Sequence, residues 1–250
     1  MPGYGDFSAV YDRLISDVDY DAYCEYICGI LSELHVPSGI LLDAACGTGT
    51  LSLLLSRKGY DVIGVDASED MLGEAQNKRI ASGEDVLFLC QPLEELDLYG
   101  TVDAAVCTLD GLNHITDEKT LQTALNRISL FMNPGGVFLF DVNTVYKHRR
   151  LLANNTFVYD LDEVYCVWQN ELEEATDTVE MSLDIFEGDG ESYVRSFESI
   201  TERAYSDEIL SALLEKAGLE KVCVYDFMSR DAVRPDSEKA VYVCRKKITA

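Results

Sequence analysis

The chain has 250 residues and a formal net charge of −25, because 45 aspartates and glutamates outnumber 20 lysines and arginines. Proteins that bind nucleic acid or an anionic membrane need a basic surface, so this balance argues against both kinds of partner. Since 47% of the residues are hydrophobic and 10% are aromatic, the chain can bury a substantial core, and we expect a globular protein.

No apolar stretch reaches the ~18–20 residues of a membrane span, and residues 1–6 lack the basic and apolar regions of a secretory signal. The eight cysteines are scattered, mostly in apolar runs. Cys24 and Cys28 lie one helical turn apart, which is how a metal site can begin, but the chain has only three histidines. We therefore expect no metal, and reduced, buried thiols in a cytoplasmic protein.

Two helices are predicted before residue 35. Apolar residues at positions 7, 10, 11 and 14 share one helical face, and those at 23, 27, 30, 31 and 34 share a second. Asp19 is a suitable N-cap between them. The chain therefore opens with a helical segment.

From residue 39 onward, short apolar strands alternate with amphipathic helices. Strands are predicted at 40–43, 61–66, 86–89, 102–107 and 137–140, and helices at 51–57, 68–80 and 117–132. Ser68 and Asp117 are candidate N-caps, and Asn133-Pro134-Gly135-Gly136 is expected to end the last of these helices. Continuous apolar strands between helices indicate a doubly wound α/β domain with a parallel sheet covered on both faces.

Residues 145–205 break this rhythm. Positions 179–185 alternate between apolar and polar residues, as in a half-exposed strand, and a turn at 188–190 separates them from a second alternating run. We expect an antiparallel β insertion after the fifth strand, acting as a substrate lid or in dimerisation. Ser206 then caps a helix that ends near Gly218, and strands at 222–225 and 240–244 form a hairpin. Residues 1–144 and 206–250 would together form the main domain.

The segment Leu41-Leu42-Asp43-Ala44-Ala45-Cys46-Gly47-Thr48-Gly49 reads as a strand followed by a glycine-containing turn that opens a helix. Such a turn presents backbone N–H groups at the carboxyl edge of the sheet, where ligands bind in open α/β folds. Glycines there let a ligand approach the main chain closely. A Gly-x-Gly turn alone is weak support for a ligand site.

Three further positions narrow the ligand. Asp66 ends the second strand, 23 residues after Asp43, and is placed to accept hydrogen bonds from ribose hydroxyls. Asp43 at the end of the first strand would repel a pyrophosphate but can pair with an ammonium group. Ser52 stands where the dinucleotide motif expects a third glycine. The pattern favours a nucleoside with a cationic amino-acid tail and disfavours a nicotinamide dehydrogenase.

With Val65-Asp66-Ala67-Ser68-Glu69-Asp70-Met71-Leu72, this segment resembles the class I S-adenosylmethionine-dependent methyltransferases. Within that family the chain is similar to small-molecule enzymes, including N-methyltransferases of amino sugars and other amines. The resemblance covers most of the chain, including Phe7-Ser8-Ala9-Val10-Tyr11-Asp12, Asn133-Pro134-Gly135-Gly136 and the terminal hairpin. It implies a Rossmann-like, seven-stranded sheet whose last strand is antiparallel.

The resemblance also implies which residues bind S-adenosyl-L-methionine. Gly47 and its neighbours would contact the methionine part, Asp43 its ammonium group, Asp66 the ribose, and Ala67 and Met71 the adenine. Relatives usually place an adenine-binding Asp where this chain has Pro92, so that role would fall to Gln91 and the Leu93 amide. The full expected set is Tyr11, Asp43, Ala45, Cys46, Gly47, Gly49, Asp66, Ala67, Met71, Gln91, Leu93 and Leu109.

Residues 108–114 follow the fourth strand and would lie beside the transferable methyl group. Transfer from a sulfonium needs mainly in-line positioning, and a base only when the nucleophile arrives protonated. His114 is the candidate base and Asp110 the candidate residue that orients an amine. As an alternative, His114 caps the helix that starts near Asp117. Tyr146 and His148 are weaker candidates, for which we expect solvent-facing positions.

Four aromatic residues of the insertion, Tyr159, Tyr165, Trp168 and Tyr193, would either form a substrate lid or simply pack within a sheet. The leading functional hypothesis is methylation of a small molecule at an amine nitrogen, with O- or C-methylation as an alternative. A non-catalytic cofactor- or partner-binding module is the competing class, suggested by Pro92 and by Ala45, which stands where many relatives have glycine. We expect no nucleic acid or membrane partner, and allow a homodimer.

The negative charge is concentrated in one region. Residues 151–210 contain 16 acidic residues against two basic ones, Arg195 and Arg203. One interpretation is a solubilising face of outward-pointing carboxylates. The other is a field that attracts cationic amines to the site.

Overall fold

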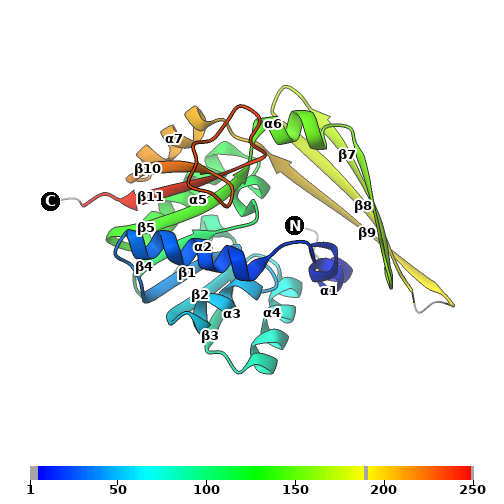
Figure 1. Cartoon of the computed structure of the whole chain (residues 1–250), viewed down its shortest axis with the longest axis horizontal. Coiled ribbons are helices and arrows are strands. Elements are labelled where there is room, and N and C mark those ends of the chain that lie inside the picture. The colour runs from blue at the N-terminus through cyan, green and yellow to red at the C-terminus, as the bar shows by residue number, and fades with distance from the viewer. Residues whose placement is uncertain (1–4, 189–190, 249–250) are drawn as a thin grey trace.

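The computed structural model describes residues 5–188 and 191–248, in which the chain forms two separate sheets (Figure 1). The larger sheet has seven strands in the order β10-β11-β5-β4-β1-β2-β3. Its strands are β1 (Gly39–Ala44), β2 (Tyr60–Asp66), β3 (Val86–Cys90), β4 (Val102–Cys107), β5 (Met132–Asn143), β10 (Leu219–Asp226) and β11 (Lys239–Lys246). Strands β1 to β5 are parallel, and β11 runs antiparallel between β5 and β10. This confirms the predicted Rossmann-like sheet with an antiparallel last strand.

Neighbouring residues of a strand point to opposite sides of the sheet, so continuous apolar strands present apolar side chains on both faces. Helices cover both of these faces. Leu41 packs with α2 (Tyr20–Glu33), α3 (Thr50–Arg57) and α4 (Glu69–Ser82) on one face. Leu42 packs in a second core with α5 (Glu118–Phe131) and α7 (Asp207–Lys216) on the other face. The apolar strands are therefore buried on both sides, as their sequence predicts.

All four predicted N-caps are confirmed. The side chains of Asp19, Ser68, Asp117 and Ser206 each accept a hydrogen bond from the backbone N–H three residues later, at 2.9, 3.2, 2.9 and 3.4 Å. Each bond satisfies an N–H group that has no partner within its helix. These local signals fix the start of four helices without help from the tertiary fold.

The entry to β5 differs from the prediction. The strand begins at Met132, five residues before the expected start, and residues 133–136 form a bulge within it. Val102 of β4 pairs with Met132, whereas Ala104, two residues on, pairs with Val137. Because Met132 already pairs with β4, the strand begins before residues 133–136. These four residues then interrupt the pairing instead of preceding the strand.

The smaller sheet is antiparallel, with the order β6-β7-β8-β9. Its strands are β6 (Thr156–Leu161), β7 (Val164–Glu173), β8 (Thr178–Gly188) and β9 (Tyr193–Arg203), and α6 (Val145–Lys147) and the helical turn η3 (His148–Leu152) lead into it. Two residues of the predicted turn, Asp189 and Gly190, lie outside the described residues. Figure 1 shows this sheet projecting from the main domain, joined to it at the α6 end.

The smaller sheet buries only one of its faces. Val179, Met181, Leu183 and Ile185 of β8 are at most 3% exposed, while Glu180 between them points to solvent. The buried residues pack with Phe7 and Val10 of α1 (Gly5–Leu14), and that helix also approaches α4. Of the helices in the described part of the chain, none is both long and apolar enough to cross a membrane.

Candidate cofactor and substrate site

A cavity of about 360 Å³ lies at the carboxyl edge of the parallel strands, bounded by the larger sheet, α1 and the inner face of the smaller sheet. This is the edge where open α/β sheets bind ligands. Most of the predicted site residues line the cavity: Tyr11, Ala45, Cys46, Gly47, Asp66, Ala67, Met71, Leu93, Leu109, Asp110 and His114. The predicted residues Asp43, Gly49 and Gln91 do not line it.

The two glycines of the turn after β1 are required for different reasons. Gly47 has a φ of +53°, and no atom lies within 4 Å of the position where a Cβ would stand, so a ligand can approach the backbone there. A Cβ on Gly49 would lie 2.7 Å from the Phe88 ring and 2.8 Å from Ala75, so this glycine serves packing. Ala45 has a φ of +58°, in the left-handed region that favours glycine.

Asp66 ties the glycine turn to the start of α4. Its carboxylate accepts hydrogen bonds from the backbone N–H groups of Gly47, at 2.8 Å, and Ser68, at 2.9 Å. Burial raises the pKa of Asp66, and these two bonds only partly oppose that effect. A carboxylate has about four acceptor positions, so Asp66 retains capacity for donors from the cavity that it lines.

Asp43 lies beneath the turn and is only 1% exposed. Ser52 donates a hydrogen bond to its Oδ2, while Oδ1 has no donor among the described residues. Burial raises the pKa of Asp43 to about 7, and the nearby Asp66 adds to the effect. Ser52, which departs from the dinucleotide motif, thus supports the Asp43 carboxylate. The contact of Asp43 with a cofactor ammonium group stays a prediction.

The segment after β3 differs from the expected arrangement. The Gln91 side chain accepts a hydrogen bond from the Asp97 N–H at 2.9 Å and donates one to the Asp97 carbonyl at 3.3 Å. It is therefore engaged away from the cavity, whose wall here consists of Pro92, Leu93 and Glu94. Glu94, which the sequence analysis did not single out, supplies a carboxylate two residues beyond Pro92.

Helix α1 is fastened to the glycine turn by polar contacts. The Thr48 hydroxyl donates to Asp12 at 2.7 Å, and Lys78 donates to the Thr48 hydroxyl at 2.8 Å while forming an ion pair with Asp12. Tyr11, the neighbour of Asp12, lines the cavity and packs edge-on against Phe7. These contacts place the N-terminal helix against the predicted cofactor site.

The loop after β4 is held by a buried carboxylate of β5. Leu109 and Asp110 have φ values of +52° and +58°, which are strained for residues other than glycine. Asp141, fully buried, accepts hydrogen bonds from the N–H groups of both residues, at 2.7 and 3.0 Å, and from the Tyr23 hydroxyl. These bonds stabilise the loop conformation that turns Leu109 and Asp110 toward the cavity.

Asp110 is already paired with a lysine. Lys239 of β11 forms an ion pair with Asp110, and its Nζ lies 3.5 Å from Asp141 Oδ2. Burial alone would raise the pKa of Asp110, but the charges of Lys239 and Lys147 outweigh it and hold the pKa well below its ordinary value. Asp110 is therefore ionised near neutral pH, and its predicted role of orienting an amine would have to compete with Lys239.

His114 lies in the turn η2 (Gly111–His114) and lines the cavity, with its Nε2 3.7 Å from Glu202 Oε1. Because Asp117 caps α5, the alternative capping role for His114 is wrong. Glu202, near the end of β9, is only 5% exposed and lines the same cavity. Asn143 donates a hydrogen bond to Glu202 Oε2 at 2.9 Å.

The expectation that His148 faces solvent is wrong. His148 is fully buried because β7 and β8 pack over the η3 turn that contains it. Its Nδ1 lies 2.9 Å from the Asp177 carbonyl oxygen, and its Nε2 lies 3.5 Å from Glu202 Oε2. Tyr146 is half-buried and lines a separate depression beside α7.

The ligand atoms of Asp110, His114 and Glu202 lie within 4.8 Å of one another, a spacing that could hold a metal ion. The Lys239 ammonium, however, already provides a cation for Asp110. Two of the four predicted lid aromatics, Tyr159 and Trp168, line the cavity. Tyr165 and Tyr193 are 39% and 66% exposed and do not.

Comparison with known proteins agrees with this geometry. Residues 41–136 match the family described as a methyltransferase domain. A crystal structure of an S-adenosylmethionine-dependent methyltransferase from Clostridium acetobutylicum ATCC 824 is 36% identical, with a TM-score of 0.89 over 97% of this chain and 98% of that one. YqeM of Bacillus subtilis (strain 168), assigned to the methyltransferases, is 32% identical over 87% of this chain and 86% of its own.

A more distant structure is the sugar N-methyltransferase KedS8 from Streptoalloteichus sp ATCC 53650. It is 21% identical, with a TM-score of 0.74 over 93% of this chain and 92% of that one, and at this identity the likeness concerns the fold. The chain belongs to the S-adenosylmethionine-dependent methyltransferases. It is an enzyme, and its cofactor is S-adenosyl-L-methionine.

The residues at the carboxyl edge fit this cofactor. Open space over Gly47, the spare acceptor capacity of Asp66 and the apolar side chains of Met71 and Leu93 suit a backbone-bound tail, a ribose and an adenine respectively.

Several polar residues of the cavity were not predicted from the sequence. Asn143 lies at the carboxyl end of β5, so the same edge argument that selected Asp43 and Asp66 also applied to it. Lys147, Glu202 and Lys239 also line the cavity but come from three distant segments. No local pattern marks these three as neighbours.

Proposed function

We propose that this enzyme transfers a methyl group from S-adenosylmethionine to an amine nitrogen of a small molecule. The observation that carries the proposal is the position of His114 and Glu202. Both line the same cavity as Gly47 and Asp66, and Glu202 comes from β9 of the smaller sheet. An amine that arrives protonated needs a base before it can attack, and these two side chains are the candidates that Lys239 does not occupy.

The cofactor, when bound, supplies a methyl group activated on a sulfonium, and the chain's own residues do the rest. Asp141 fixes the loop that carries Leu109, and Leu109 in turn limits where the nucleophile can sit. Trp168, Met181 and Leu183 of the smaller sheet close the opposite side with apolar surface and exclude water. A cavity enclosed in this way suits a small molecule.

The smaller sheet supplies this wall, so we propose that residues 145–205 act as a substrate lid on the domain formed by residues 1–144 and 206–250.

KedS8, named a sugar N-methyltransferase, has the same fold, and this likeness supports an amine as acceptor. A homodimer through the smaller sheet is also proposed, because β9 is an edge strand with exposed Tyr193, Val194 and Phe197. Analytical ultracentrifugation tests it, and a monomer at all concentrations contradicts it.

The function is tested by calorimetric titration with S-adenosylmethionine, followed by assays of S-adenosylhomocysteine release with matched amines, alcohols and thiols. We expect cofactor binding and methyl transfer to an amine. Transfer confined to hydroxyls or thiols would overturn the choice of nitrogen. Cofactor binding without turnover on any acceptor class would overturn the proposed function.

A further inference from the structure

Two oppositely charged groups, the half-buried Lys147 and the buried Glu202, lie on either side of one amide in the cavity. Lys147 Nζ donates to Asn143 Oδ1 at 2.9 Å, and Asn143 Nδ2 donates to Glu202 Oε2 at 2.9 Å. All three residues line the cavity. The lysine and the glutamate are therefore close but separated by a neutral side chain, and they do not form an ion pair with each other.

Lys147 differs from the other lysine of the same wall. Lys239 pairs with Asp110 and Asp141, whereas no carboxylate of the described residues lies within 4.0 Å of the Lys147 ammonium. Burial, and then the nearby positive charge of Lys239, lower the pKa of Lys147. Asp110, Glu202 and Glu238 oppose this shift at longer range, but the hydrogen-bond acceptor of the half-buried ammonium is a neutral amide, so an anion placed beside it would be stabilised.

The Glu202 carboxylate likewise lacks a lysine or arginine partner within 4.0 Å among the described residues. In the described part of the chain, the only basic groups within 4.0 Å of its carboxylate are the imidazoles of His114 and His148, at 3.7 and 3.5 Å. Lys147 and Lys239 act on it only from a longer distance. A ligand ammonium group beside Glu202 would restore the balance, and His114 or Glu202 could then accept its proton.

We propose that the methyl acceptor is an amino acid in the chemical sense, with its amine toward Glu202 and His114 and its carboxylate toward Lys147. This inference rests on the proposed function, since it defines the acceptor for the same site. The rest of the acceptor lies against the apolar wall formed by Trp168, Met181 and Leu183, which favours an apolar side chain. Lys147 is then the residue that selects for the acid.

The chain offers a direct probe of this site, because Trp168 is its only tryptophan and lines the cavity. We would saturate the protein with S-adenosylhomocysteine and titrate it with phenylalanine, phenethylamine and hydrocinnamate while recording tryptophan fluorescence. The two latter compounds lack the carboxylate and the amine respectively. Phenylalanine should bind about tenfold or more tightly than either, because each charged contact contributes on that scale.

Variants at position 147 identify the group responsible. In Lys147→Met the advantage of phenylalanine over phenethylamine should fall to about twofold or less, and Lys147→Arg should keep most of it. Lys119→Met, which removes an exposed lysine of α5, is the control and should behave as wild type. Thermal unfolding of each variant checks the fold, and because Lys147 is half-buried and forms no ion pair within 4.0 Å in the described residues, Lys147→Met should change the stability little.

Equal binding of phenylalanine and phenethylamine, an unchanged ratio in Lys147→Met, or no binding of all three compounds would overturn the inference. Methyl transfer to phenethylamine as efficient as to phenylalanine would overturn it while leaving the proposed N-methylation intact. A carboxylate preference that depends on Lys147, without methyl transfer to any amine, would support this binding mode and overturn the proposed function.

Discussion

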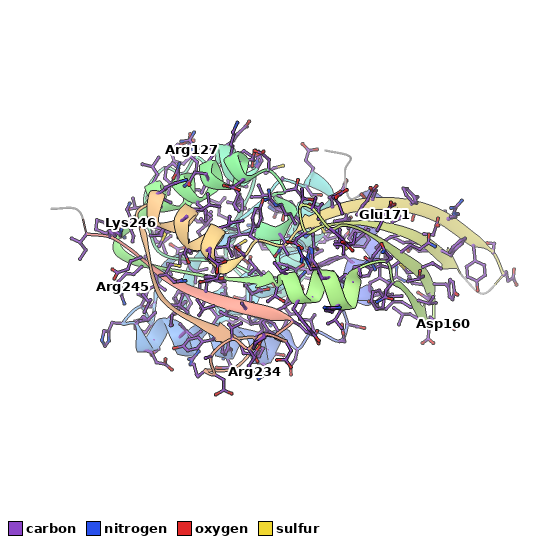
Figure 2. All side chains as sticks on the ribbon, turned by 90° about the horizontal axis from the view of Figure 1, so that it is seen from above. Arg127, Asp160, Glu171, Arg234, Arg245 and Lys246 are labelled. Atoms are coloured by element: carbon purple, nitrogen blue, oxygen red, sulfur yellow. The ribbon has the colours of Figure 1, made fainter. Side chains whose placement is uncertain are left out.

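The two sheets contribute to the cavity in different ways. The larger sheet supplies loops at its carboxyl edge, where Asp66 and Asp141 hold backbone N–H groups of the glycine turn and of the loop after β4. The smaller sheet supplies one apolar face and a single buried carboxylate, Glu202, whereas the other acidic residues of 151–210 that the structure describes do not line the cavity. Figure 2 shows Asp160 and Glu171 on the smaller sheet, and Arg234, Arg245 and Lys246 on the main domain.

Under the proposed function, this difference separates a cofactor half of the cavity from an acceptor half. Backbone groups fixed by short-range hydrogen bonds form the first, and its geometry depends on few side chains. The second depends on side chains brought from β5, α6, β9 and β11, so its chemistry can change by substitution without disturbing the fold. The following predictions separate the two halves, beginning with the largest expected effect.

Gly47→Val tests the cofactor half. The substitution adds a branched side chain at a φ of +53° in the open space over the turn, so S-adenosylmethionine affinity should fall more than about 100-fold. Isothermal titration calorimetry measures it. The control is Gly73→Ala on the exposed side of α4, which has open space and should leave affinity unchanged. Wild-type affinity in Gly47→Val would contradict the assignment of the turn.

Glu202→Gln tests the acceptor half. Without the buried carboxylate, the proton of the amine is removed less readily, so turnover of an amine should fall about 100-fold. Cofactor affinity should change less than about twofold. Rates of S-adenosylhomocysteine release and calorimetry separate the two effects. Glu171→Gln, on the exposed surface of the same sheet, should match wild type. If both variants lose activity equally, Glu202 has no special role.

Asp43 should make the stability of the cofactor half depend on pH. Its folded-state pKa of about 7 lies above the unfolded value of 3.8, so the folded protein retains a proton that the unfolded chain releases. The contribution of Asp43 to stability therefore decreases as pH rises from about 4 to 7, by about 2 kcal/mol between pH 5 and pH 7.

The measurement is urea unfolding of the protein without cofactor at pH 5 and pH 7, compared between wild type and Asp43→Asn. The difference in unfolding free energy between the two proteins should shift by that amount in favour of Asp43→Asn at the higher pH. A difference that stays constant between the two pH values would show that the Asp43 pKa is not raised.

Ala45→Gly should stabilise the glycine turn slightly. Ala45 has a φ of +58°, and glycine adopts this conformation without the steric cost of a Cβ. We expect a gain of about 1 kcal/mol in unfolding free energy and less than about a twofold change in cofactor affinity, by urea unfolding and calorimetry. A loss of stability would show that packing of the Ala45 methyl group dominates.

The smallest effect concerns the acidic exterior of the smaller sheet. If its charge attracts cationic amines, kcat/KM for an amine should fall about two- to threefold as ionic strength rises from low to moderate values. Steady-state kinetics in increasing sodium chloride measure this, with a neutral alcohol's binding as the control. A flat profile would indicate that these carboxylates serve only solubility.

Much of the fold could be predicted because its signals are local. Asp19, Ser68, Asp117 and Ser206 cap helices through bonds to residues three positions away, and apolar runs identified the parallel strands. The bulge at 133–136 was not predictable, because it depends on where Met132 pairs with β4. The same contrast, between local signals and tertiary pairing, applies to the two halves of the site.

By itself, the sequence predicted the strand, the glycine turn and Asp66 of the proposed cofactor half, since they are close in the chain and any parallel sheet gathers them at one edge. Only the tertiary structure decided the acceptor half. It buried His148 beneath β7 and β8, engaged Gln91 with Asp97, and brought Lys147, Glu202 and Lys239 around one cavity. Charged residues so far apart in sequence become partners only through packing. In the folded chain, Lys239 pairs with Asp110, whereas Lys147 has no carboxylate of the described residues within 4.0 Å.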